Sequence, residues 1–381
     1  MAEGQKKGLE GVVIADTRLS RVQGDIGKLT YCGYNINDLA ANASFEEVVY
    51  LLWHVRLPTK AELDEFRNTL NAEMVLPDAV LEAMRALPKN AHPMGVLRTA
   101  VSLVGLFDAK AEDSSPEANL YKAMSLTAKL PTITAAWARL RKGKEPVAPH
   151  KDLGLAANFV YMLNDREPKQ VEVDALNVYL VLLADHGVNA STFTSRVVTS
   201  TDSDMYSAVT AAIGSLKGPK HGGANEAAMR MFNEVAQADS VEKWFKEEVK
   251  GKGRRLMGIG HRVYKAPDPR ALILKVHAHE LCKLNNNCGL LEVADKLADL
   301  AAADPYFIER KLYPNVDYYS AIVLDAAGIE TDMMTPIFAM SRVAGWSAHI
   351  IEQWADNRLI RPRARYVGPE NLEWVPIEKR G

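Results

Sequence analysis

Most of the chain consists of segments rich in Ala, Leu, Glu, Lys and Met, with few runs of alternating β-branched residues. Residues of this kind favour helices, and a half-buried strand would need a period-two pattern that is rare here. The sequence therefore predicts a mainly α fold. Besides two helices that open at Thr59 and Pro77, helices are expected near residues 44–55, 92–107, 119–140, 151–164, 174–185, 204–216, 224–236, 270–284, 290–303, 317–327 and 335–357.

Local signals add detail to this prediction. Thr59 and Glu62 have the spacing of a capping box at a helix start. Gly11 to Ile14 and Lys28 to Tyr34 are strand-like and flank a polar turn, which predicts a small N-terminal β-ribbon. Asp108 to Ala118 is predicted to be a surface loop. No open parallel sheet is expected.

Charge and cysteine content limit the partners and the compartment. The 381 residues carry 46 basic and 48 acidic side chains, so neither nucleic acid nor a membrane surface is an expected partner. Cys32, Cys282 and Cys288 are odd in number and lack the close spacing of a zinc site, so they are interpreted as ordinary thiols. The N-terminus lacks the apolar core of a signal peptide, and no stretch approaches the roughly 20 apolar residues of a membrane span. We expect a cytoplasmic protein.

The composition changes after residue 217. Gly, His and Arg become frequent and the helical segments shorten, until a long apolar helix resumes near residue 335. This change predicts a small inserted domain, residues 222–330, whose borders form a cleft with a large domain made of residues 1–221 and 331–381.

Two histidines are flanked by glycines, which let the backbone approach a ligand closely. His221 lies in Gly218-Pro-Lys-His-Gly-Gly-Ala-Asn225, and His261 lies in Gly258-Ile-Gly-His-Arg-Val-Tyr-Lys265. A glycine turn that only caps a helix explains the first segment equally well. The first segment lacks the G-x-x-x-x-G-K-S/T pattern of a P-loop. The second is not a dinucleotide fingerprint, because Val263 stands where the fingerprint needs glycine.

An arginine and an aspartate complete the candidate chemistry. Asp268-Pro-Arg270 predicts an N-cap, a proline at the first helical position and an arginine in the first turn. Such an arginine is usually a solvated surface residue, and Asp317 could be a helix cap, but both lie near the glycine-flanked histidines. Carbon–carbon bond chemistry needs a base, a neutral donor for an oxyanion and cationic forks for carboxylates. The combination predicts an acid/base enzyme that handles an anion.

The other titratable residues predict no metal site. His277 and His279 are two residues apart on a helix and point in different directions. The remaining histidines lack a polar constellation and are expected to be structural: His54, His92, His150 and His349. The basic residues from Lys250 to Lys265 form either a solvated face or a site for a phosphate-bearing ligand.

Taken together, these segments resemble the citrate synthase family, in the shorter form typical of bacteria and archaea. The resemblance runs over nearly the whole chain. It is also carried by Gly27-Lys-Leu-Thr-Tyr-Cys-Gly-Tyr34, Ala184-Asp-His-Gly-Val-Asn-Ala-Ser-Thr192, Ser341-Arg-Val-Ala-Gly-Trp346 and Asn357-Arg-Leu-Ile-Arg-Pro362. It implies an almost all-helical homodimer whose small domain closes over acetyl-CoA and oxaloacetate to form citrate and CoA. No metal or prosthetic group is implied, and acetyl-CoA is a cosubstrate.

The resemblance also implies a role for each matching residue. Asp317 would be the base, His221 would hold the enol oxygen, and His261 would donate to the oxaloacetate carbonyl. Oxaloacetate would be bound by His186, Asn189, Arg270, Arg342 and, across the dimer, Arg361. CoA would contact Arg255, Leu256, Gly258, Ile259, Gly260, Arg262, Lys265, Lys311 and Asn315.

Two alternatives remain open on sequence grounds. The 2-methylcitrate synthases resemble the chain in the same catalytic set and use propionyl-CoA, and one methylene is worth only about 1–3 kcal/mol of discrimination. Ile259 and Ala321 depart from residues common in citrate synthases and lie where substrate choice could be affected. The alternative of a different class is a helical CoA- or anion-binding protein without turnover, which the presence of His221, His261 and Asp317 disfavours.

Overall fold

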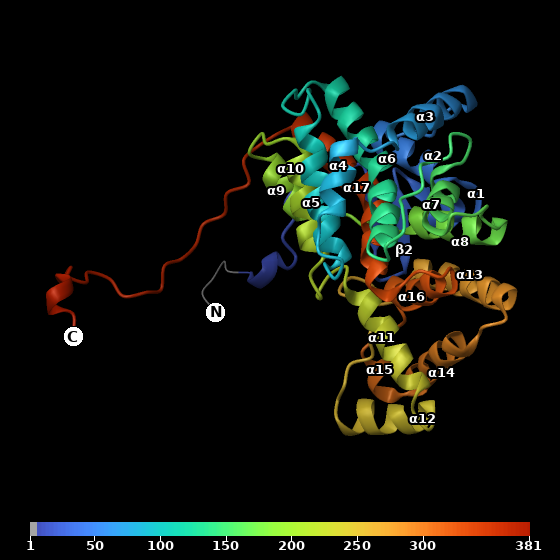
Figure 1. Ribbon diagram of the computed structural model, residues 1–381. Coiled ribbons are helices and arrows are strands. Elements are labelled where there is room, and N and C mark those ends of the chain that lie inside the picture. Colours follow the sequence, from blue (N-terminus) through green and yellow to red (C-terminus); the bar gives the residue numbers. More distant parts are fainter. Residues whose placement is uncertain (1–5) are drawn as a thin grey trace.

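The computed structural model describes residues 6–381. Residues 1–5, part of the N-terminal stretch in which the sequence showed no apolar core of a signal peptide, lie outside it. The prediction of a mainly α fold is confirmed, and every predicted helical stretch coincides with a helix (Figure 1). The first eight helices are α1 Ile36–Asn42, α2 Phe45–His54, α3 Lys60–Glu73, α4 Asp78–Arg85, α5 Pro93–Leu106, α6 Pro116–Leu140, α7 Leu155–Asn164 and α8 Gln170–Leu183. The others are α9 Ala190–Thr199, α10 Met205–Leu216, α11 Ala224–Ala236, α12 Val241–Trp244, α13 Pro269–Asn285, α14 Gly289–Ala303, α15 Pro305–Glu309, α16 Val316–Ala326 and α17 Met334–Ala355.

Some helices were not predicted. The sequence analysis missed α1, α9, α15 and α12 with the π-helical turn Phe245–Gly251 that follows it. Helix α9 is rich in Thr, Ser and Val, which are weak helix formers, but it packs against α10 and α17. Tertiary packing of this kind overrides propensity. The predicted loop from Asp108 is also shorter than expected, because α6 begins at Pro116, capped by Ser115.

Two helices buried on nearly every side form the centre of the larger body. Nearly all side chains of α6 from Ala123 to Leu140 and of α17 from Met334 to Ile350 are buried. A helix that is apolar all round belongs in a core. Figure 1 shows α17 in the middle of the body, and it contacts α2, α6, α8, α9 and α10. Among the described residues no helix is long and apolar enough to cross a membrane.

A second group of helices extends from one end of this body. Helices α11, α12, α14 and α15 lie at the bottom of Figure 1, with α13 and α16 between them and the body. Helix α16 packs against α11, α13 and α14, whereas α13 also contacts α1 and α8 of the body. Helices α13 and α16 therefore connect the two groups, and both carry candidate site residues at their N-termini.

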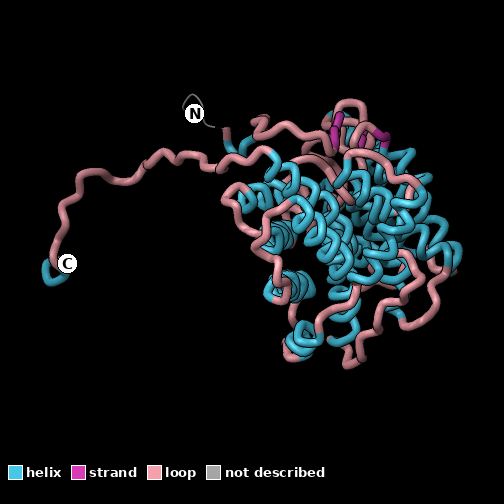
Figure 2. Tube along the Cα trace, turned by 90° about the horizontal axis from the view of Figure 1, so that it is seen from above, coloured by secondary structure: helices cyan, strands magenta, loops and turns pink. Residues whose placement is uncertain are grey.

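The predicted β-ribbon exists, but one strand lies elsewhere. The antiparallel strands are β1 Ser20–Gln23, β2 Lys28–Tyr31 and β3 Tyr34–Asn35, at one edge of the molecule in Figure 2. Residues 11–14 form no strand, which corrects the prediction. The polar turn that reverses the chain is residues 24–27, and it pairs Val22 with Leu29. The ribbon rests on the end of α8, where the Tyr31 hydroxyl donates to the Leu182 and Asp185 carbonyls at 3.1 and 2.8 Å.

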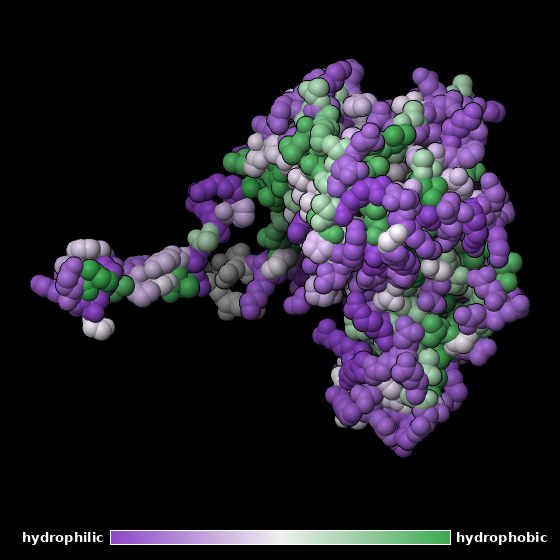
Figure 3. Space-filling model, in the orientation of Figure 1, coloured by the Kyte–Doolittle hydropathy of each residue, from purple (hydrophilic) through white to green (hydrophobic). Residues whose placement is uncertain are grey.

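The chain beyond α17 leaves the body. The Ile360 amide still donates to the Ser200 hydroxyl at 3.0 Å, and the residues that follow run outwards as an extended segment (Figure 1). Figure 3 shows apolar patches along this C-terminal segment. Its exposed large apolar residues are Tyr366, Val367, Leu372, Trp374, Val375 and Ile377.

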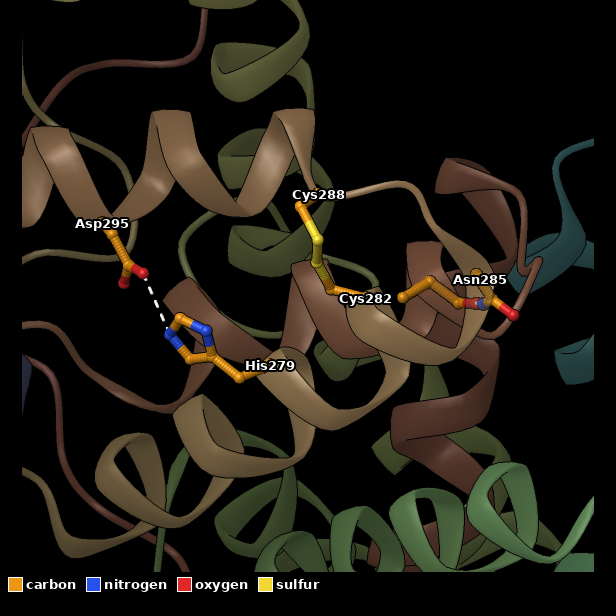
Figure 4. Close-up of a disulfide and its surroundings, with 6 residues drawn as sticks. His279, Cys282, Asn285, Cys288 and Asp295 are labelled. Atoms are coloured by element: carbon orange, nitrogen blue, oxygen red, sulfur yellow. Dashed lines mark hydrogen bonds and ion pairs between the residues drawn. A yellow bond between two sulfur atoms is a disulfide. The ribbon is translucent and has the colours of Figure 1, made fainter.

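The interpretation of all three cysteines as free thiols is wrong. Cys282 in the last turn of α13 forms a disulfide with Cys288, just before α14 (Figure 4). Asn286, in a left-handed conformation with φ 49°, ends α13 and reverses the chain, so the two Cα atoms lie 5.0 Å apart. The His279 imidazole also reaches Asp295 of α14 at 3.0 Å. Cys32 is a free thiol, and burial raises its pKa to about 12.

The disulfide closes a short loop and should stabilise the fold modestly. Replacing Cys288 with Ser should lower the free energy of unfolding by about 2 kcal/mol, because the unfolded chain loses its cross-link. For a chain of this size, that corresponds to a fall of roughly 2–3 °C in the melting temperature. Differential scanning calorimetry would measure it.

Reduction of the wild-type protein should lower its melting temperature by the same amount, whereas the Cys288→Ser variant should not respond to reductant. If alkylation of the unreduced, denatured protein labelled all three cysteines, the disulfide would be absent and the prediction wrong.

Candidate active site

The first part of the candidate site is the turn between α8 and α9. This turn carries His186 and ends at Asn189, whose side chain caps α9 by accepting from the amides of Ser191 and Thr192 at 3.2 Å each. The His186 Nε2 atom lies 3.2 Å from the Tyr264 hydroxyl. Burial, with the nearby charges of Arg270 and Arg342, holds the pKa of His186 well below its usual value. His186 is therefore a neutral polar group at neutral pH.

His221 is also neutral, and its contacts identify its tautomer. The backbone amide of Ser191 donates to the Nε2 atom at 3.3 Å, and the Ser191 hydroxyl lies 2.8 Å from the same atom. Because an amide only donates, Nε2 must be an acceptor and the proton must sit on Nδ1. Burial, aided by the charge of Arg342, lowers the pKa of His221 to about 4. His221 is thus a neutral Nδ1–H donor.

His261 has the opposite tautomer. Its Nδ1 atom accepts from the backbone amides of Val263 and Tyr264 at 3.0 and 3.1 Å, which leaves the proton on Nε2. Burial and the charge of Arg270 lower its pKa to about 4. The imidazoles of His261 and His186 lie with ring centroids 5.4 Å apart. The site therefore contains two neutral donors on different segments.

Arg270 is not a surface residue. The predicted cap is confirmed, because the Asp268 carboxylate accepts from the Arg270 amide at 3.1 Å at the start of α13. The same carboxylate binds the Arg270 guanidinium at 3.0 and 2.8 Å, and both side chains are buried. Asp268 also accepts from the Val316 amide at 3.1 Å. The arginine is thereby fixed beside the start of α16.

A second buried arginine comes from the central helix α17. The Arg342 Nε donates to the Leu183 carbonyl at 2.7 Å, and its guanidinium lies 4.8 Å from the Phe338 ring centre. Phe338 also packs against the His221 ring. Two guanidinium groups that are almost completely buried, at 2% exposure each, need an anion to balance them. Asp268 neutralises one of them.

Asp317 is not a helix cap. Asn315 caps α16 by accepting from the Asp317 amide at 2.9 Å, so the capping interpretation of Asp317 is wrong. The Asp317 Oδ1 atom is buried and has no hydrogen-bond partner among the described residues. Burial raises the pKa of Asp317 to about 7, although the charges of Arg270 and Arg342 act in the other direction. A carboxylate with such a pKa is well matched to removing a proton near neutral pH.

The glycine-rich segment before His261 lies against the start of α16. The Gly260 amide donates to the Tyr313 carbonyl at 2.8 Å, and the Asn315 amide donates to the Gly258 carbonyl at 2.8 Å. The Asn315 side chain reaches the Gly260 carbonyl at 2.7 Å. A Cβ atom on Gly258, whose φ is +76°, would lie 2.9 Å from the Tyr318 Cα. Glycine is required there because the two backbones approach so closely.

The residues predicted to contact CoA fall into separate places. Arg255 lines a surface cavity of about 340 Å³ with Arg230, Arg254 and Met257. Arg262 and Lys265 instead lie towards the N-terminal segment, where Arg262 pairs with Glu10 at 3.4 Å and the Lys265 amide donates to Gly24. Lys311 is exposed in the turn after α15.

Arg361 does not join the site within one chain, because it is exposed on the extended segment after α17.

Sequence reasoning missed several residues that shape the site. Ser191 sets the tautomer of His221 and also accepts from the Trp346 indole at 3.0 Å. Tyr264 contacts His186 and stacks on Arg270. Arg230 contributes a positive charge to the cavity beside Arg255. Ser191 could have been found, because it lies two residues after Asn189 in the motif from Ala184 to Thr192. No sequence signal pointed to Arg230.

The fold and the site define the class of protein: a mainly α enzyme with an acid/base site beside two buried arginines. The family model "Citrate synthase, C-terminal domain" matches residues 8–363. The chain is 50% identical over 375 residues to citrate synthase 2 of Bacillus subtilis, covering 98% of this chain and 99% of that protein. It is 43% identical over 366 residues to a 2-methylcitrate synthase of Mycobacterium tuberculosis, covering 96% of this chain and 91% of that protein.

Solved structures agree. The fold matches citrate synthase of Thermoplasma acidophilum, in a ternary complex with carboxymethyl coenzyme A and oxaloacetate, with a TM-score of 0.93 and 39% identity over 98% of this chain and 99% of that one. Citrate synthase of Pyrobaculum aerophilum matches with a TM-score of 0.92 and 44% identity over 98% of this chain and 95% of that one. The chain belongs to the citrate synthase family.

Proposed function

We propose that the protein condenses acetyl-CoA with oxaloacetate and water to give citrate and CoA, an acyl transfer in which the acyl group becomes an alkyl group. The observation that carries this proposal is Asp317, a half-buried residue whose Oδ1 atom is inaccessible and whose pKa is raised to about 7, together with two neutral histidines and two buried arginines. A base for a weakly acidic methyl group needs such a raised pKa, and the developing oxyanions need neutral donors in a site closed to water.

The roles follow from the tautomers. Asp317 removes a proton from the thioester methyl group, while the Nδ1–H of His221 donates to the oxygen of the enol that forms. The enol carbon attacks the carbonyl carbon of oxaloacetate, and the Nε2–H of His261 donates to the carbonyl oxygen as it becomes a hydroxyl. Water then cleaves the thioester of the citryl-CoA product, which releases CoA.

Oxaloacetate is bound by charge complementarity in this proposal. Its two carboxylates face Arg270 and Arg342, and His186 and the Asn189 turn complete the site. Arg270 already has Asp268 as a counter-charge, whereas no carboxylate lies within 4.0 Å of Arg342 among the described residues. A guanidinium takes a carboxylate through two parallel hydrogen bonds, and each such bond gains strength where water is excluded.

CoA is placed along the loop from Leu256 to Gly260, with Asn315 near the thioester. The 340 Å³ cavity beside this loop supports an extension of the sequence-based assignment, because apolar Met231 and Met257, three arginines and Glu234, the carboxylate partner of Arg254, line it. Apolar walls suit an adenine ring, and the guanidinium groups suit phosphates. Arg254 is paired with Glu234 and Arg230 with Glu226, so Arg255, which has no ion pair among the described residues, stays the proposed phosphate contact here, beside Arg262, Lys265 and Lys311.

The two groups of helices support two domains, residues 222–330 and the remainder. Closure of the small domain would exclude water from the enol. In an open site, water would protonate the enol before it could attack oxaloacetate. We place the boundary between His221 and α11, so that the large domain supplies His221 and the small domain supplies Asp317. A cytoplasmic location remains a prediction, and the Cys282–Cys288 disulfide weakens the argument for it from cysteine content.

The choice between acetyl-CoA and propionyl-CoA is open to a direct test. Relatives of both kinds match over nearly the whole chain, and Ala321, which departs from the common glycine, is completely buried in α16. Release of CoA thiol should be followed with oxaloacetate and either acyl-CoA at matched concentrations. A higher kcat/KM for acetyl-CoA is expected, and a preference for propionyl-CoA would identify the protein as a 2-methylcitrate synthase. Binding of both substrates without thiol release would instead support a non-catalytic CoA-binding protein.

The raised pKa of Asp317 predicts the pH dependence of turnover. Asp317 must be ionised to act as a base, so kcat/KM should rise with pH up to about 7 and then level off. Below pH 7, where the protonated form dominates, kcat/KM should fall by about tenfold per unit. His221 and His261 have pKa values of about 4, so they stay neutral throughout this step.

Asp317→Asn should lose the pH step and lower kcat by about a hundredfold to ten-thousandfold, because an amide cannot accept the proton. Asp325→Asn is the matched control, since Asp325 lies on the same helix and burial also raises its pKa, yet it lies near the other end of the helix from the site. Near-normal turnover in Asp317→Asn would remove Asp317 as the base.

The proposal includes a homodimer in which Arg361 completes the partner's site. The extended segment that carries Arg361 leaves the body with a series of exposed apolar residues, as expected for a segment that packs on another chain. Arg361→Ala should raise KM for oxaloacetate, whereas Arg363→Ala, two residues along the same exposed segment, should not.

Co-expression of Asp317→Asn chains with Arg361→Ala chains tests the cross-subunit arrangement. Mixed dimers should regain activity, because one of their two sites then has an intact Asp317 and an intact Arg361. No recovery in mixed dimers, or an unchanged KM in Arg361→Ala, would contradict the arrangement.

A further inference from the structure

A cluster of buried charged residues lies directly behind the turn that carries His186. His349 and Glu352 of α17 meet Arg196 of α9 and Asp185, which follows the end of α8. The His349 Nε2 atom lies 3.2 and 3.4 Å from the two Asp185 oxygens, and its Nδ1 atom lies 3.1 Å from the Arg196 guanidinium. His349 and Asp185 are completely buried. The expectation that His349 lacks a polar constellation is therefore wrong.

The arginine decides which nitrogen of His349 carries the proton. A guanidinium has donors and no acceptor, so the Nδ1 atom of His349 must accept from Arg196. The proton of the neutral ring then sits on Nε2 and faces the Asp185 carboxylate. Arg196 is itself held by Gln353 at 2.9 Å and Glu352 at 3.0 Å. The hydrogen bonds from Arg196 to His349 thus leave one N–H donor, on the His349 ring, facing Asp185.

Asp185 connects this hydrogen-bonded cluster to the turn that carries His186. Its carboxylate accepts from the Gly187 amide at 3.2 Å and from the Ser20 hydroxyl, which also accepts from Gly187 at 2.9 Å. The Asp185 backbone amide and carbonyl both bond to the Tyr31 hydroxyl, at 3.2 and 2.8 Å. His186 therefore lies between two residues, Asp185 and Gly187, whose backbones are held in place.

Asp185 also influences the arginine of the site. Burial acts to raise the pKa of Asp185, but contact with His349, the charge of Arg342 and the Ser20 hydroxyl together hold it below its usual value. Asp185 is therefore ionised at neutral pH. Its charge favours the charged form of Arg342, whose pKa burial otherwise lowers. Asp185 acts on Arg342 only through its charge, whereas it holds the His186 turn through a direct hydrogen bond from the Gly187 amide.

We propose that Asp185, oriented by His349 and Arg196, is a positioning residue that sets the geometry of the His186 turn for binding a dicarboxylate substrate. The inference rests on the proposed function, because it concerns the oxaloacetate side of that site. A completely buried carboxylate is costly, and an apolar core would stabilise the fold at least as well. Asp185 lies one residue before His186, so a role in substrate binding explains why a charged residue is kept at this buried position.

The test compares substrate affinity with stability. Asp185→Asn keeps the size of the side chain but removes its charge and places an amide donor against the His349 donor. It should weaken oxaloacetate binding about tenfold to a hundredfold, the effect of losing a hydrogen bond to a charged group. Isothermal titration calorimetry with oxaloacetate measures this without turnover, and KM for acetyl-CoA should stay unchanged.

Two variants of His349 keep the test decisive if Asp185→Asn does not fold. His349→Leu removes both hydrogen bonds and should weaken oxaloacetate binding, whereas His349→Gln supplies a donor for Asp185 and an acceptor for Arg196 and should restore it. Ser347→Ala is the matched control, because Ser347 is a buried polar residue of the same helix that bonds to Trp53 at 2.9 Å, away from the turn. It should lower the melting temperature without changing affinity.

The outcomes separate the two proposals. If the wild-type protein binds oxaloacetate and His349→Leu and Asp185→Asn bind it equally well, the positioning role is wrong and the proposed function stands. If the variants lose stability in proportion to Ser347→Ala with no change in affinity, Asp185 is only a structural residue. If the wild-type protein does not bind oxaloacetate, both the proposed function and the positioning role are overturned.

Discussion

The buried ion pair between Asp268 and Arg270 holds together the two helices that carry most of the site. Asp268 caps α13, binds the Arg270 guanidinium through both oxygens and accepts from the Val316 amide at the start of α16. A buried charge without a partner is strongly destabilising, so neither residue can leave this arrangement alone. The pair therefore fixes Arg270 beside the first turn of α16, where Asp317 follows Val316. The distance between Arg270, the proposed anion-binding group, and Asp317, the proposed base, therefore depends on a single carboxylate.

Exclusion of water then gives the titratable groups of the site their chemical character. The same burial raises the pKa of Asp317 and lowers those of His186, His221 and His261, because in each case it disfavours the charged form. A base near neutrality and three neutral imidazoles follow from one physical cause. The arginines remain charged, since a guanidinium loses its proton only at very high pH. The site is therefore positive where a dicarboxylate would bind and neutral where an enol oxygen would form.

Segments far apart in the chain support this small region. The β-ribbon supplies Tyr31 and Ser20, α17 supplies Arg342 and His349, and all of them converge on the residues that follow α8. Backbone contact at this point is close: the Gly345 amide donates to the Ala184 carbonyl at 3.1 Å, which leaves no room for a Cβ atom. The turn that carries His186 is thus held between the β-ribbon and α17, consistent with a substrate-binding position that must not move.

Local sequence was sufficient for the helical class, the helix starts at Thr59 and Asp268, and the glycine-flanked histidines, because propensity, capping and glycine signals act over a few residues. Family resemblance was needed to assign Asp317 as a base, since its neighbours alone suggested a cap. The first strand, helix α9 and the Cys282–Cys288 disulfide could not be obtained in this way, because each depends on a partner segment or a chain reversal. The raised pKa of Asp317, the tautomers of its histidines and the Asp185–His349 pair arise only when distant segments exclude water together, and desolvation is a property of the folded chain.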